Sequence, residues 1–375
     1  MKILLTGGGT GGHFYPIIAI AEELNTQIRA DKIINAKLYF MSPSPYDKAL
    51  LFDNNLIFIK SYAGKIRLYP SLLNILDIPI AILGAIRAIW DLFWIYPDVV
   101  FSKGGYGSFP TLFAARFLLI PVIIHESDSV PGKVSKWSGK FARRVALSYD
   151  EASSYFKAEK VAVTGQPIRR ELITPLKFGA KEFLKLEEHL PIIFITCGSQ
   201  GSVIINDVIV RALPTLLTKY QVIHQVGPAN VEQVKKDVAF VLGDSPHKER
   251  YKMFGYLSVL AMRMSAGVSD IIIARAGSTI FEIALWGIPS IIIPITNSNG
   301  NHQRENAYAY ARTGSAVVIE ESNLTENIVL SEIDRIISDL DSRNKMIAGT
   351  KSFAKSNAAK DIADEILKFS ITHER

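Results

Sequence analysis

Short apolar segments alternate with amphipathic helical patterns along most of this 375-residue chain. Continuous apolar runs are typical of strands that are buried on both faces of a parallel sheet. Between these runs, apolar positions recur every three or four residues, as in helices that pack on such a sheet. The pattern therefore predicts an α/β fold with parallel sheets. The predicted strands are "KILLT", "KLYFM", "DVVFS", "PVIIHE", "RRVALS" and "KVAVTG" in the first half, and "IIFITCG", "QVIHQVG", "IIIARAG" and "SIIIPI" in the second.

The two halves begin in the same way, with an apolar strand, a glycine-containing loop and a helix. "KILLTGGGTGGH" opens the first half and "PIIFITCGSQGS" opens the second. We therefore expect two doubly wound, Rossmann-like domains facing each other across a cleft, an arrangement that suits a nucleotide-sugar transferase. The predicted domains are residues 1–165 and 166–350. In the last segment, 351–375, a helix from about Ser352 to Phe369 is expected to pack back toward the first domain.

The composition is that of a folded protein, with 48% hydrophobic and 21% charged residues. Its one cysteine, Cys197, excludes an internal disulfide and fits a reducing cytoplasm. The first residues lack the apolar region and cleavage site of a secretory signal, so we expect none. The net charge of +6 favours anionic partners such as phosphates or anionic lipids. Nucleic acid is not expected, because no aromatic-plus-basic recognition motif is present.

The first glycine loop satisfies the spacing of a dinucleotide-binding motif through Gly7, Gly9 and Gly12. Such a motif also needs an acidic residue at the end of the second strand, to bind a ribose. Here that strand is followed by "SPSP", which contains no carboxylate. The sequence therefore argues against a nicotinamide cofactor, and no cofactor is predicted. The loop is interpreted as a cradle for a phosphate or a sugar.

Two further motifs follow strands of the first half. "SKGGYGSFP" places Gly104, Gly105 and Tyr106 between a strand and a helix, where the glycines form either a tight turn or an anion site. "HESDSVPG" places His125 and Glu126 at the tip of a buried strand. A histidine there contacts a ligand or is a buried structural residue, and the sequence leaves both alternatives open.

The second half, together with the segment that precedes it, carries four motifs at the ends of predicted strands or the starts of helices. "GQPIRREL" has two arginines at a helix start, where the helix dipole disfavours them unless an anion is bound. In "RAGSTIFE", Arg275 and a helix N-terminus suit a diphosphate, and the carboxylate of Glu282, one turn later, suits ribose hydroxyls. The alternative is that Arg275 and Glu282 form an ion pair with each other. The candidate residues in "GQPIRREL", "CGSQGS", "RAGSTIFE" and "NHQRENA" are Arg169, Ser199, Gln200, Arg275, Gly277, Ser278, Thr279, Glu282, Gln303 and Asn306.

A metal site is not predicted. The Asp-x-Asp motif found in metal-dependent sugar transferases occurs only at Asp339 and Asp341, in a helical segment that resembles a solvated surface. No pair of histidines or cysteines has the spacing of a zinc site. We therefore expect an arginine and loop amides to stabilise a leaving diphosphate.

The most apolar stretch, residues 68–95, is too interrupted by charges and proline to cross a membrane. Arg87 and Asp91 share one helix face and leave the remainder broadly apolar. With Lys65 and Arg67 just upstream, the segment is interpreted as a surface that lies on anionic lipid. An ordinary buried helix is the alternative.

Seven motifs occur in one order along almost the whole chain: "TGGGTGGH", "GGYGSFP", "HESD", "GQPIR", "GSQGS", "RAGSTIFE" and "NHQRENA". With this ordered set the chain resembles the MurG family of peptidoglycan glycosyltransferases, which transfer N-acetylglucosamine from UDP-N-acetylglucosamine to the lipid-linked muramoyl acceptor, lipid I. The resemblance implies a GT-B fold, a UDP-sugar held mainly by the C-terminal half, and a lipid acceptor approached from the N-terminal half. It also implies peripheral docking on the cytoplasmic face of the bacterial inner membrane.

The resemblance carries donor contacts onto specific positions, which are Thr10, Gly11, Gly12, Arg169, Ser199, the helix start from Ser278 to Glu282, and Gln303. Many relatives read His-Glu-Gln-Asn where this chain has "HESD", so that Asp128 stands where their asparagine contacts the donor. The acceptor contacts are expected at Gly104, Gly105, Tyr106 and His125.

The resulting hypothesis is an inverting, metal-independent transfer of N-acetylglucosamine to lipid I, which yields lipid II. His13 is the candidate general base, since the pKa of histidine suits proton transfer near neutrality, and Glu126 is the second candidate. Two alternatives stay open. One is a related UDP-sugar transferase that acts on another lipid, such as diacylglycerol, and the other is a UDP-sugar-binding protein without catalytic activity.

Overall fold

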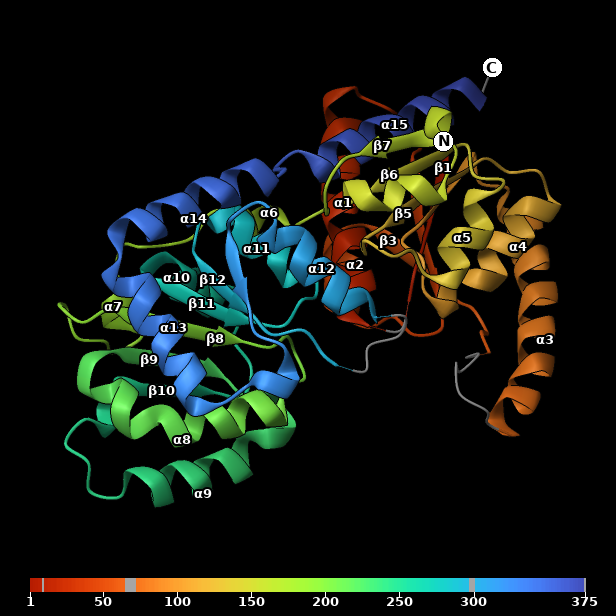
Figure 1. Ribbon diagram of the computed structural model, residues 1–375. Helices are drawn as coiled ribbons and strands as arrows, with labels where there is room; N and C mark the ends of the chain where they lie inside the picture. The colour runs from red at the N-terminus through yellow and green to blue at the C-terminus, as the bar shows by residue number, and fades with distance from the viewer. Residues whose placement is uncertain (9, 65–71, 297–300, 374–375) are drawn as a thin grey trace. The chain divides into compact units, whose positions relative to one another are not determined.

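A computed structural model of the chain describes residues 1–8, 10–64, 72–296 and 301–373 (Figure 1). The chain forms two compact units. The N-terminal unit comprises Met1–Arg170 together with Lys355–Arg375, and the C-terminal unit comprises Glu171–Ala354. The chain therefore passes between the units after Arg170 and after Ala354, whereas the sequence analysis placed these boundaries at 165 and 350.

Within the described residues, the N-terminal unit has a seven-stranded parallel sheet in the order β3-β2-β1-β4-β5-β6-β7. Its strands are β1 (Lys2–Thr6), β2 (Lys37–Ser42), β3 (Leu56–Lys60), β4 (Val99–Ser102), β5 (Val122–Glu126), β6 (Arg144–Leu147) and β7 (Val161–Val163). The strand order reverses between β1 and β4. Ligands of doubly wound sheets bind at such a reversal, outside the carboxyl ends of the strands.

Helices cover both faces of this sheet because successive residues of each strand point to opposite sides. Ile3 and Leu5 belong to a core with α1 (Gly11–Ala30) and α15 (Ala358–His373), whereas Leu4 belongs to a core with α3 (Leu72–Ile95) and α4 (Phe109–Phe117). The remaining α-helices described in the unit are α2 (Lys48–Asp53) and α5 (Lys133–Gly139).

The last helix, α15, packs against α1 although it follows the whole C-terminal unit in sequence (Figure 1). Its inward face contributes Ile362, Ala363, Ile366 and Leu367 to the core with α1. The single helix predicted from Ser352 to Phe369 is two helices in the structure. One ends at Phe353 and the next begins at Ala358, so the break between them coincides with the passage between units.

The C-terminal unit repeats this plan with a six-stranded parallel sheet in its described part, in the order β10-β9-β8-β11-β12-β13. The strands are β8 (Ile192–Thr196), β9 (Gln221–Gln225), β10 (Tyr251–Phe254), β11 (Ile271–Ala274), β12 (Ser290–Ile292) and β13 (Ala316–Val318). Its strand order reverses between β8 and β11. The helices are α6 (Arg170–Ile173), α7 (Ala180–Phe183), α8 (Val203–Lys219), α9 (Val231–Leu242), α10 (Val259–Val268), α11 (Thr279–Trp286), α12 (His302–Ala311), α13 (Glu326–Ser338) and α14 (Leu340–Phe353).

Each strand predicted from the sequence is confirmed, and so are the two parallel α/β sheets. The strands that the sequence analysis missed are β3, β10 and β13. All of them lie at an edge of a sheet. Most of their residues are only partly buried or exposed. β10 lacks the continuous apolar run that marks a central strand, whereas β3 and β13 contain short apolar runs that the sequence analysis overlooked.

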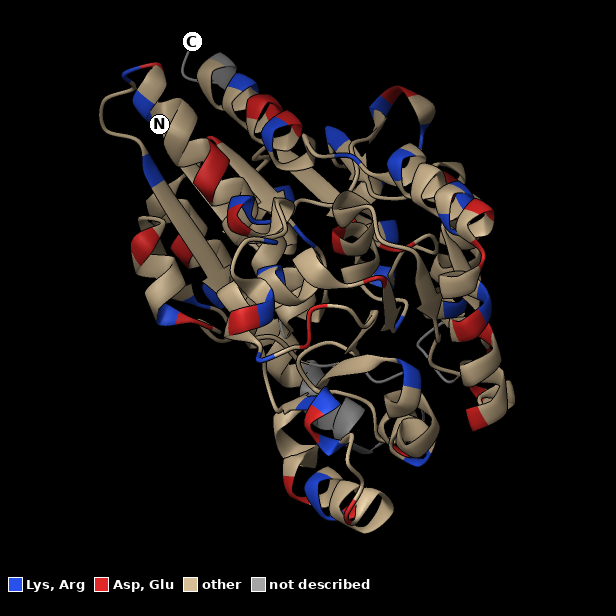
Figure 2. Ribbon diagram, turned by 90° about the vertical axis from the view of Figure 1, so that its left-hand side faces the viewer, with Lys and Arg blue, Asp and Glu red and all other residues tan. Residues whose placement is uncertain are grey.

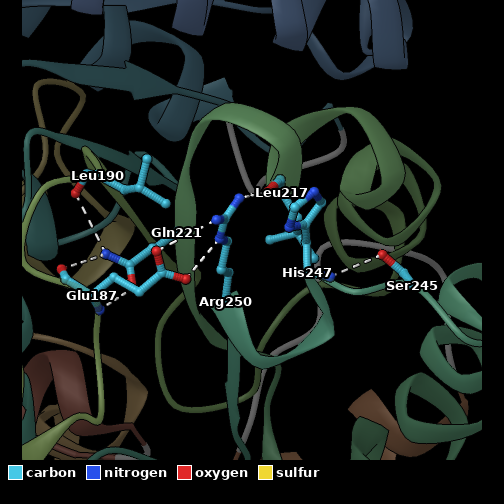
Figure 3. A network of polar contacts seen from close by, with 7 residues as sticks. All are labelled: Glu187, Leu190, Leu217, Gln221, Ser245, His247 and Arg250. Carbon is cyan, nitrogen blue, oxygen red and sulfur yellow. Dashed lines mark hydrogen bonds and ion pairs between the residues drawn. The ribbon is translucent and has the colours of Figure 1, made fainter.

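Polar residues at the amino ends of β8 and β9 hold the C-terminal sheet together (Figure 3). The Gln221 side chain accepts a hydrogen bond from the Glu187 N–H at 2.6 Å and donates one to the Glu187 carbonyl at 3.0 Å. Arg250 contacts the Glu187 carboxylate at 2.8 Å and donates to the carbonyl of Leu217 at 2.8 Å. This network satisfies backbone groups at the sheet edge opposite the carboxyl ends, so its role is structural.

Charged residues lie mainly on helices and loops, and the strands carry few of them, mostly at their ends (Figure 2). This distribution is expected for sheets that helices cover on both faces. Of the helices that the structure describes, none is both long enough and apolar enough to span a bilayer.

Replacing Ile366 on α15 with alanine should destabilise the N-terminal unit by about 2–5 kcal/mol, because a fully buried side chain is lost from a packed core. Urea denaturation, combined with hydrogen exchange of α1 peptides, measures this effect. Ile371→Ala is the matched control. Ile371 lies on the same helix but is 44% exposed, so its replacement should lower the free energy of unfolding only slightly. Equal effects of both variants would show that α15 does not complete this core.

Candidate functional site

The glycine loop after β1 is built by close packing of its first residues. A Cβ on Gly7 would lie 2.7 Å from Cδ1 of Ile17, and a Cβ on Gly8 would lie 3.0 Å from Oγ of Ser42. Gly9, part of the predicted dinucleotide spacing, lies outside the described residues. Gly12 differs, since its Cβ would have only Oγ1 of Thr10 nearby, at 3.8 Å. Gly11, the first residue of α1, is also closely packed, since its Cβ would lie 2.8 Å from the hydroxyl oxygen of Tyr46. The segment is therefore open at Gly12 and tightly packed at Gly7, Gly8 and Gly11.

The loop after β4 meets the first glycine loop at the reversal of strand order. Gly104 and Gly105 have φ angles of +80° and +82°, which favour glycine. A Cβ on Gly105 would lie 3.0 Å from the Gly8 carbonyl oxygen and 3.1 Å from Nε2 of His13. The two loops therefore touch directly, and the predicted residues Gly105 and His13 are neighbours. Tyr106 follows at the start of a short 3₁₀ helix.

His13 lies in the first turn of α1, half-buried, with Nδ1 at 3.0 Å from Oγ1 of Thr10. Burial is the main cause that lowers the pKa of His13 to about 4, and the Lys103 ammonium lowers it further, whereas the Asp128 carboxylate opposes the shift. The imidazole is therefore neutral at pH 7, but its pKa lies below the value near neutrality that the sequence analysis expected of the base.

Glu126, the second candidate base, is held by its own loop. Its carboxylate accepts hydrogen bonds from the N–H groups of Ser127, Asp128 and Gly132 at 2.8, 3.0 and 3.1 Å. Burial and the neighbouring Asp128 raise the pKa of Glu126, against the opposing effect of Lys103 and the hydrogen bonds. Only 6% of the residue is exposed, so these contacts fit an anchor for the loop after β5.

His125 is completely buried. Its Nε2 lies 3.0 Å from the Gly165 carbonyl oxygen and 3.2 Å from Oγ of Ser148. Burial, aided by the charge of Lys103, lowers the pKa of His125 well below its usual value. These contacts fit the structural alternative for His125, and a contact with an acceptor stays a prediction.

The two arginines of "GQPIRREL" have different surroundings. Arg170 forms a bidentate ion pair with Glu23, at 2.6 and 2.8 Å, so an internal carboxylate accounts for its charge and no bound anion is needed. Arg169 is largely buried, with its guanidinium 4.4 Å from the centre of the Tyr15 ring on α1. Its predicted donor contact stays a prediction.

In the C-terminal unit, the loops after β8 and β9 pack backbone against backbone. A Cβ on Gly201 would lie 1.9 Å from the Val226 carbonyl oxygen, and one on Gly227 would lie 2.1 Å from the Gln200 carbonyl oxygen. Both residues have positive φ angles. This packing leaves Ser199 and the side chain of Gln200 exposed at the carboxyl edge of the sheet.

Arg275 follows β11 and forms an ion pair with Glu321 at 2.5 Å. It also donates hydrogen bonds to Oγ of Ser202 at 2.7 Å and to the Ile293 carbonyl at 3.1 Å. The Glu321 carboxylate in turn accepts from the N–H and hydroxyl of Thr296, at 3.1 and 2.9 Å. The alternative that Arg275 pairs with Glu282 is therefore wrong, because its carboxylate partner is Glu321.

The N-terminus of α11 is open. A Cβ on Gly277 would meet no atom within 4 Å, and the Ser278 side chain caps no backbone N–H of the helix. Thr279 and Glu282 lie in the first turn and are partly buried. The N–H groups of Ile280 and Phe281 donate to the carbonyls of Gly277 and Ser278, at 3.2 and 3.1 Å. The earlier N–H groups of this helix start suit a diphosphate.

The two amide side chains predicted to bind sugar hydroxyls both contact backbone in the structure. Oε1 of Gln303 accepts a hydrogen bond from the Ile295 N–H at 3.2 Å. Asn306 is buried and donates to the Ala276 carbonyl at 3.3 Å. Asn306 thus supports the turn after β11, and its contact with a donor stays a prediction.

The predicted residues form one group in each unit, at the loops that follow the central strands. The N-terminal group brings together Thr10, His13 and Gly105, with Asp128 from the loop after β5 close enough to affect the pKa of His13. Sequence reasoning missed two charged members, Lys103 and Glu321. Lys103 could have been found from the sequence, because it directly precedes the glycine pair of "SKGGYGSFP". Glu321 could not, because nothing in the sequence around it indicates that it pairs with Arg275.

Asp339 of the Asp-x-Asp pair has a structural role. Its carboxylate caps α14 by accepting hydrogen bonds from the N–H groups of Asp341 and Ser342, at 3.1 and 3.0 Å. The part of the chain that the structure describes has no cluster of three His, Cys, Asp or Glu side chains arranged to hold a metal ion.

The chain matches two family models, the glycosyltransferase family 28 N-terminal domain over residues 3–147 and the C-terminal domain of the same family over residues 192–366. A protein of Treponema denticola named UDP-N-acetylglucosamine–N-acetylmuramyl-(pentapeptide) pyrophosphoryl-undecaprenol N-acetylglucosamine transferase is 33% identical, with 95% of this chain and 93% of the relative aligned. A protein of the same name from Natranaerobius thermophilus is 31% identical, with 96% and 98% aligned.

The crystal structure of MurG from Acinetobacter baumannii is similar in fold, with a TM-score of 0.73 over 98% of this chain and 99% of that one, at 24% identity. This similarity confirms the predicted GT-B architecture of two Rossmann-like domains.

Replacing Glu321 with alanine should destabilise the C-terminal unit by about 3–5 kcal/mol, because it leaves the Arg275 guanidinium buried without its carboxylate. Native-state hydrogen exchange of peptides from this unit measures the loss. Glu320→Ala is the control, because its partner Arg304 is 55% exposed and such pairs contribute at most about 1 kcal/mol. If the two variants were equally stable, the Arg275–Glu321 pair would not be a structural element of the site.

Proposed function

The chain belongs to glycosyltransferase family 28, and we propose that it transfers N-acetylglucosamine from UDP-N-acetylglucosamine to lipid I, giving lipid II and UDP. The observation that carries this proposal is the similarity to transferases of that name, which extends over almost the full length of both chains. Open positions in the loops at the carboxyl ends of both sheets, such as Gly12 and Gly277, support the proposal, because ligands of doubly wound sheets bind there.

The C-terminal unit is proposed to bind the UDP-sugar. The N–H groups that precede Ile280 at the start of α11 would bind the diphosphate, and Glu282, one turn later, would accept hydrogen bonds from ribose hydroxyls. Arg275 would mainly hold the loops around this site in place, since its guanidinium already binds Glu321 and Ser202. The proposed transfer needs no metal ion, in keeping with the capping role of Asp339.

The N-terminal unit is proposed to bind the acceptor and supply the base. An acceptor hydroxyl would attack the anomeric carbon as the bond from that carbon to the UDP oxygen breaks, which inverts the configuration. His13 would take the hydroxyl proton on Nε2 while Nδ1–H donates to Oγ1 of Thr10. Of the two candidate bases His13 is favoured, because three N–H groups already bind the Glu126 carboxylate.

Turnover with purified protein tests the function. Labelled UDP-N-acetylglucosamine is supplied with lipid I, with diacylglycerol, or with no acceptor, and each reaction is repeated with a chelator. Label in lipid I, with and without the chelator, is the expected result. Label in diacylglycerol would assign the chain to a different lipid acceptor, and donor binding without any transfer would favour a binding protein.

Replacing His13 with alanine should lower kcat by about 10²–10⁴ and leave UDP affinity nearly unchanged, because a base acts on the acceptor hydroxyl. Steady-state kinetics and calorimetry measure the two quantities. His13→Asn can keep the hydrogen bond to Thr10, so it separates a capping role from catalysis. Near-normal kcat in both variants would transfer the role of base to Glu126.

A membrane-facing surface is proposed on α3 and α4 of the N-terminal unit. These helices pack against each other (Figure 1), and α3 buries Ala85, Ala88 and Leu92. Its opposite side, with the end of α4, exposes large apolar side chains, defined here as the apolar surface: Ile82, Leu83, Ile86, Trp90, Phe93, Trp94, Phe113, Phe117 and Leu119. A patch of this kind marks an interaction site, and the lipid acceptor makes a membrane its natural partner.

The membrane is proposed to be the bacterial inner membrane, approached from its cytoplasmic face, with the chain bound peripherally. Arg87 beside the apolar surface is 60% exposed and can reach anionic headgroups. Lys65 and Arg67 of the sequence-based prediction lie outside the described residues.

Replacing Ile86, Trp90 and Phe93 together with glutamate should lower binding to anionic phosphatidylglycerol vesicles at least about tenfold, since burial of each apolar side chain contributes more than 1 kcal/mol. Vesicle sedimentation measures this loss. Phe178, Phe183 and Phe240, which are exposed in the C-terminal unit, are changed to glutamate as the matched control. The proposed docking surface is wrong if the two triple variants, both folded, sediment alike.

A further inference from the structure

Tyr15, near the start of α1, has the guanidinium of Arg169 over its ring. The Cζ atom of Arg169 lies 4.4 Å from the ring centre. Arg169 is far from Tyr15 in sequence, close to the point where the chain leaves the N-terminal unit, and only 8% of the residue is exposed. A cation–π contact is strongest where the cation is withdrawn from water. The contact therefore fixes a largely buried arginine against the helix that follows the first glycine loop.

The Tyr15 ring is itself held by aromatic neighbours and by a glycine. Its centre lies 5.7 Å from that of Phe14 and 5.7 Å from that of Tyr46, and both pairs meet edge to face. A Cβ on Gly11 would lie 3.0 Å from Cε2 of Tyr15 and 2.8 Å from the Tyr46 hydroxyl oxygen. Tyr46 has a φ angle of +56°, which is rare for a bulky side chain. Gly11 thus makes room for the two rings, and close packing holds the Tyr15 ring in place.

The two successive arginines, Arg169 and Arg170, are held on α1 by different kinds of partner. Arg170 forms its bidentate ion pair with Glu23, and its N–H donates to the Glu22 carboxylate at 3.1 Å. Both glutamates follow Tyr15 by about two helical turns, so all three side chains share one face of the helix. A carboxylate neutralises the charge of its arginine, whereas an aromatic ring attracts a cation without an opposite charge. The Tyr15 contact therefore fixes the position of the Arg169 charge without itself neutralising it.

We propose that Tyr15 is a positioning residue, which holds the Arg169 guanidinium in place for the diphosphate of a substrate. The inference rests on the proposed function, in which the donor and the acceptor each carry a diphosphate, and on the sequence-based prediction that Arg169 contacts the donor. A guanidinium binds phosphate oxygens through N–H groups in a fixed planar arrangement, so its orientation matters more than that of an ammonium group. A side chain that is already held also loses less conformational freedom when the ligand binds.

The test is a double-mutant cycle on the full-length protein, with the affinity for UDP-N-acetylglucosamine measured by calorimetry. Tyr15→Leu should weaken binding about tenfold, as expected for loss of a desolvated cation–π contact. Tyr15→Phe keeps the ring and should bind as the wild type does. In the Arg169→Ala background, Tyr15→Leu should have no further effect, because a residue that acts through Arg169 loses its role together with it.

The KM for lipid I, measured in the same four variants, distinguishes the two sources of a diphosphate. Weaker binding of the UDP-sugar assigns Arg169 to the donor, and a raised KM for lipid I assigns it to the acceptor. Either result supports the proposal if the effect of Tyr15→Leu disappears in the Arg169→Ala background. Tyr15→Met, which fills more of the space of the ring, replaces the leucine variant if the latter does not fold.

Phe141→Leu is the matched control, because Arg116 lies over the Phe141 ring at 4.9 Å in the same unit. It should leave both substrate constants unchanged. The proposal is overturned if Tyr15→Leu has the same effect with and without Arg169, since the ring would then only support the fold. It is also overturned if Arg169→Ala leaves both constants normal. Absence of transfer to lipid I by the wild-type protein would instead refute the proposed function, and the cycle on UDP-sugar binding would still test the role of Tyr15.

Discussion

Close packing of backbone against backbone, at the loops that leave the central strands, is the constraint on which both sites depend. In the N-terminal unit, a side chain at Gly105 would collide with the Gly8 carbonyl and with His13. In the C-terminal unit, Gly201 and Gly227 exclude any Cβ between the loops after β8 and β9. Close approach of this kind fixes the path of the backbone at the glycines concerned. A preformed site of this kind loses little conformational freedom when a ligand binds.

Much of the fold could be predicted from the sequence because the central strands are buried on both faces. "IIFIT" and "IIIA" are buried at every position and almost entirely apolar, and the glycine-containing loops that follow such short runs mark them as strands. The edge strands have no such requirement. β10 contains Lys252 and is only partly buried, so its sequence resembles that of a loop. The passage between units at Ala354 was also placed too early, since α14 continues through Gly349 to Phe353.

The site was predictable where its residues lie in one short motif. Thr10 and His13 are three positions apart on a helix start, and their contact follows from that spacing. Partners that are distant in sequence could not be assigned in this way. Glu321 is 46 residues from Arg275, and only the folded sheet shows that the loops after β11 and β13 meet. Glu126 illustrates a third case, in which the residue was found but its hydrogen bonds to its own loop could not be foreseen.

The position of α15 has a consequence for how the polypeptide reaches its folded state. The core of the N-terminal unit needs Ile362 and Ile366, yet a ribosome synthesises these residues only after the whole C-terminal unit. The C-terminal unit is a continuous segment, so it can fold as soon as it has emerged. In the N-terminal unit, one face of α1 instead stays uncovered until α15 has been synthesised. Premature termination near Ala354 would therefore leave an intact C-terminal unit attached to a partner with exposed apolar surface, which is a substrate for chaperones and proteases.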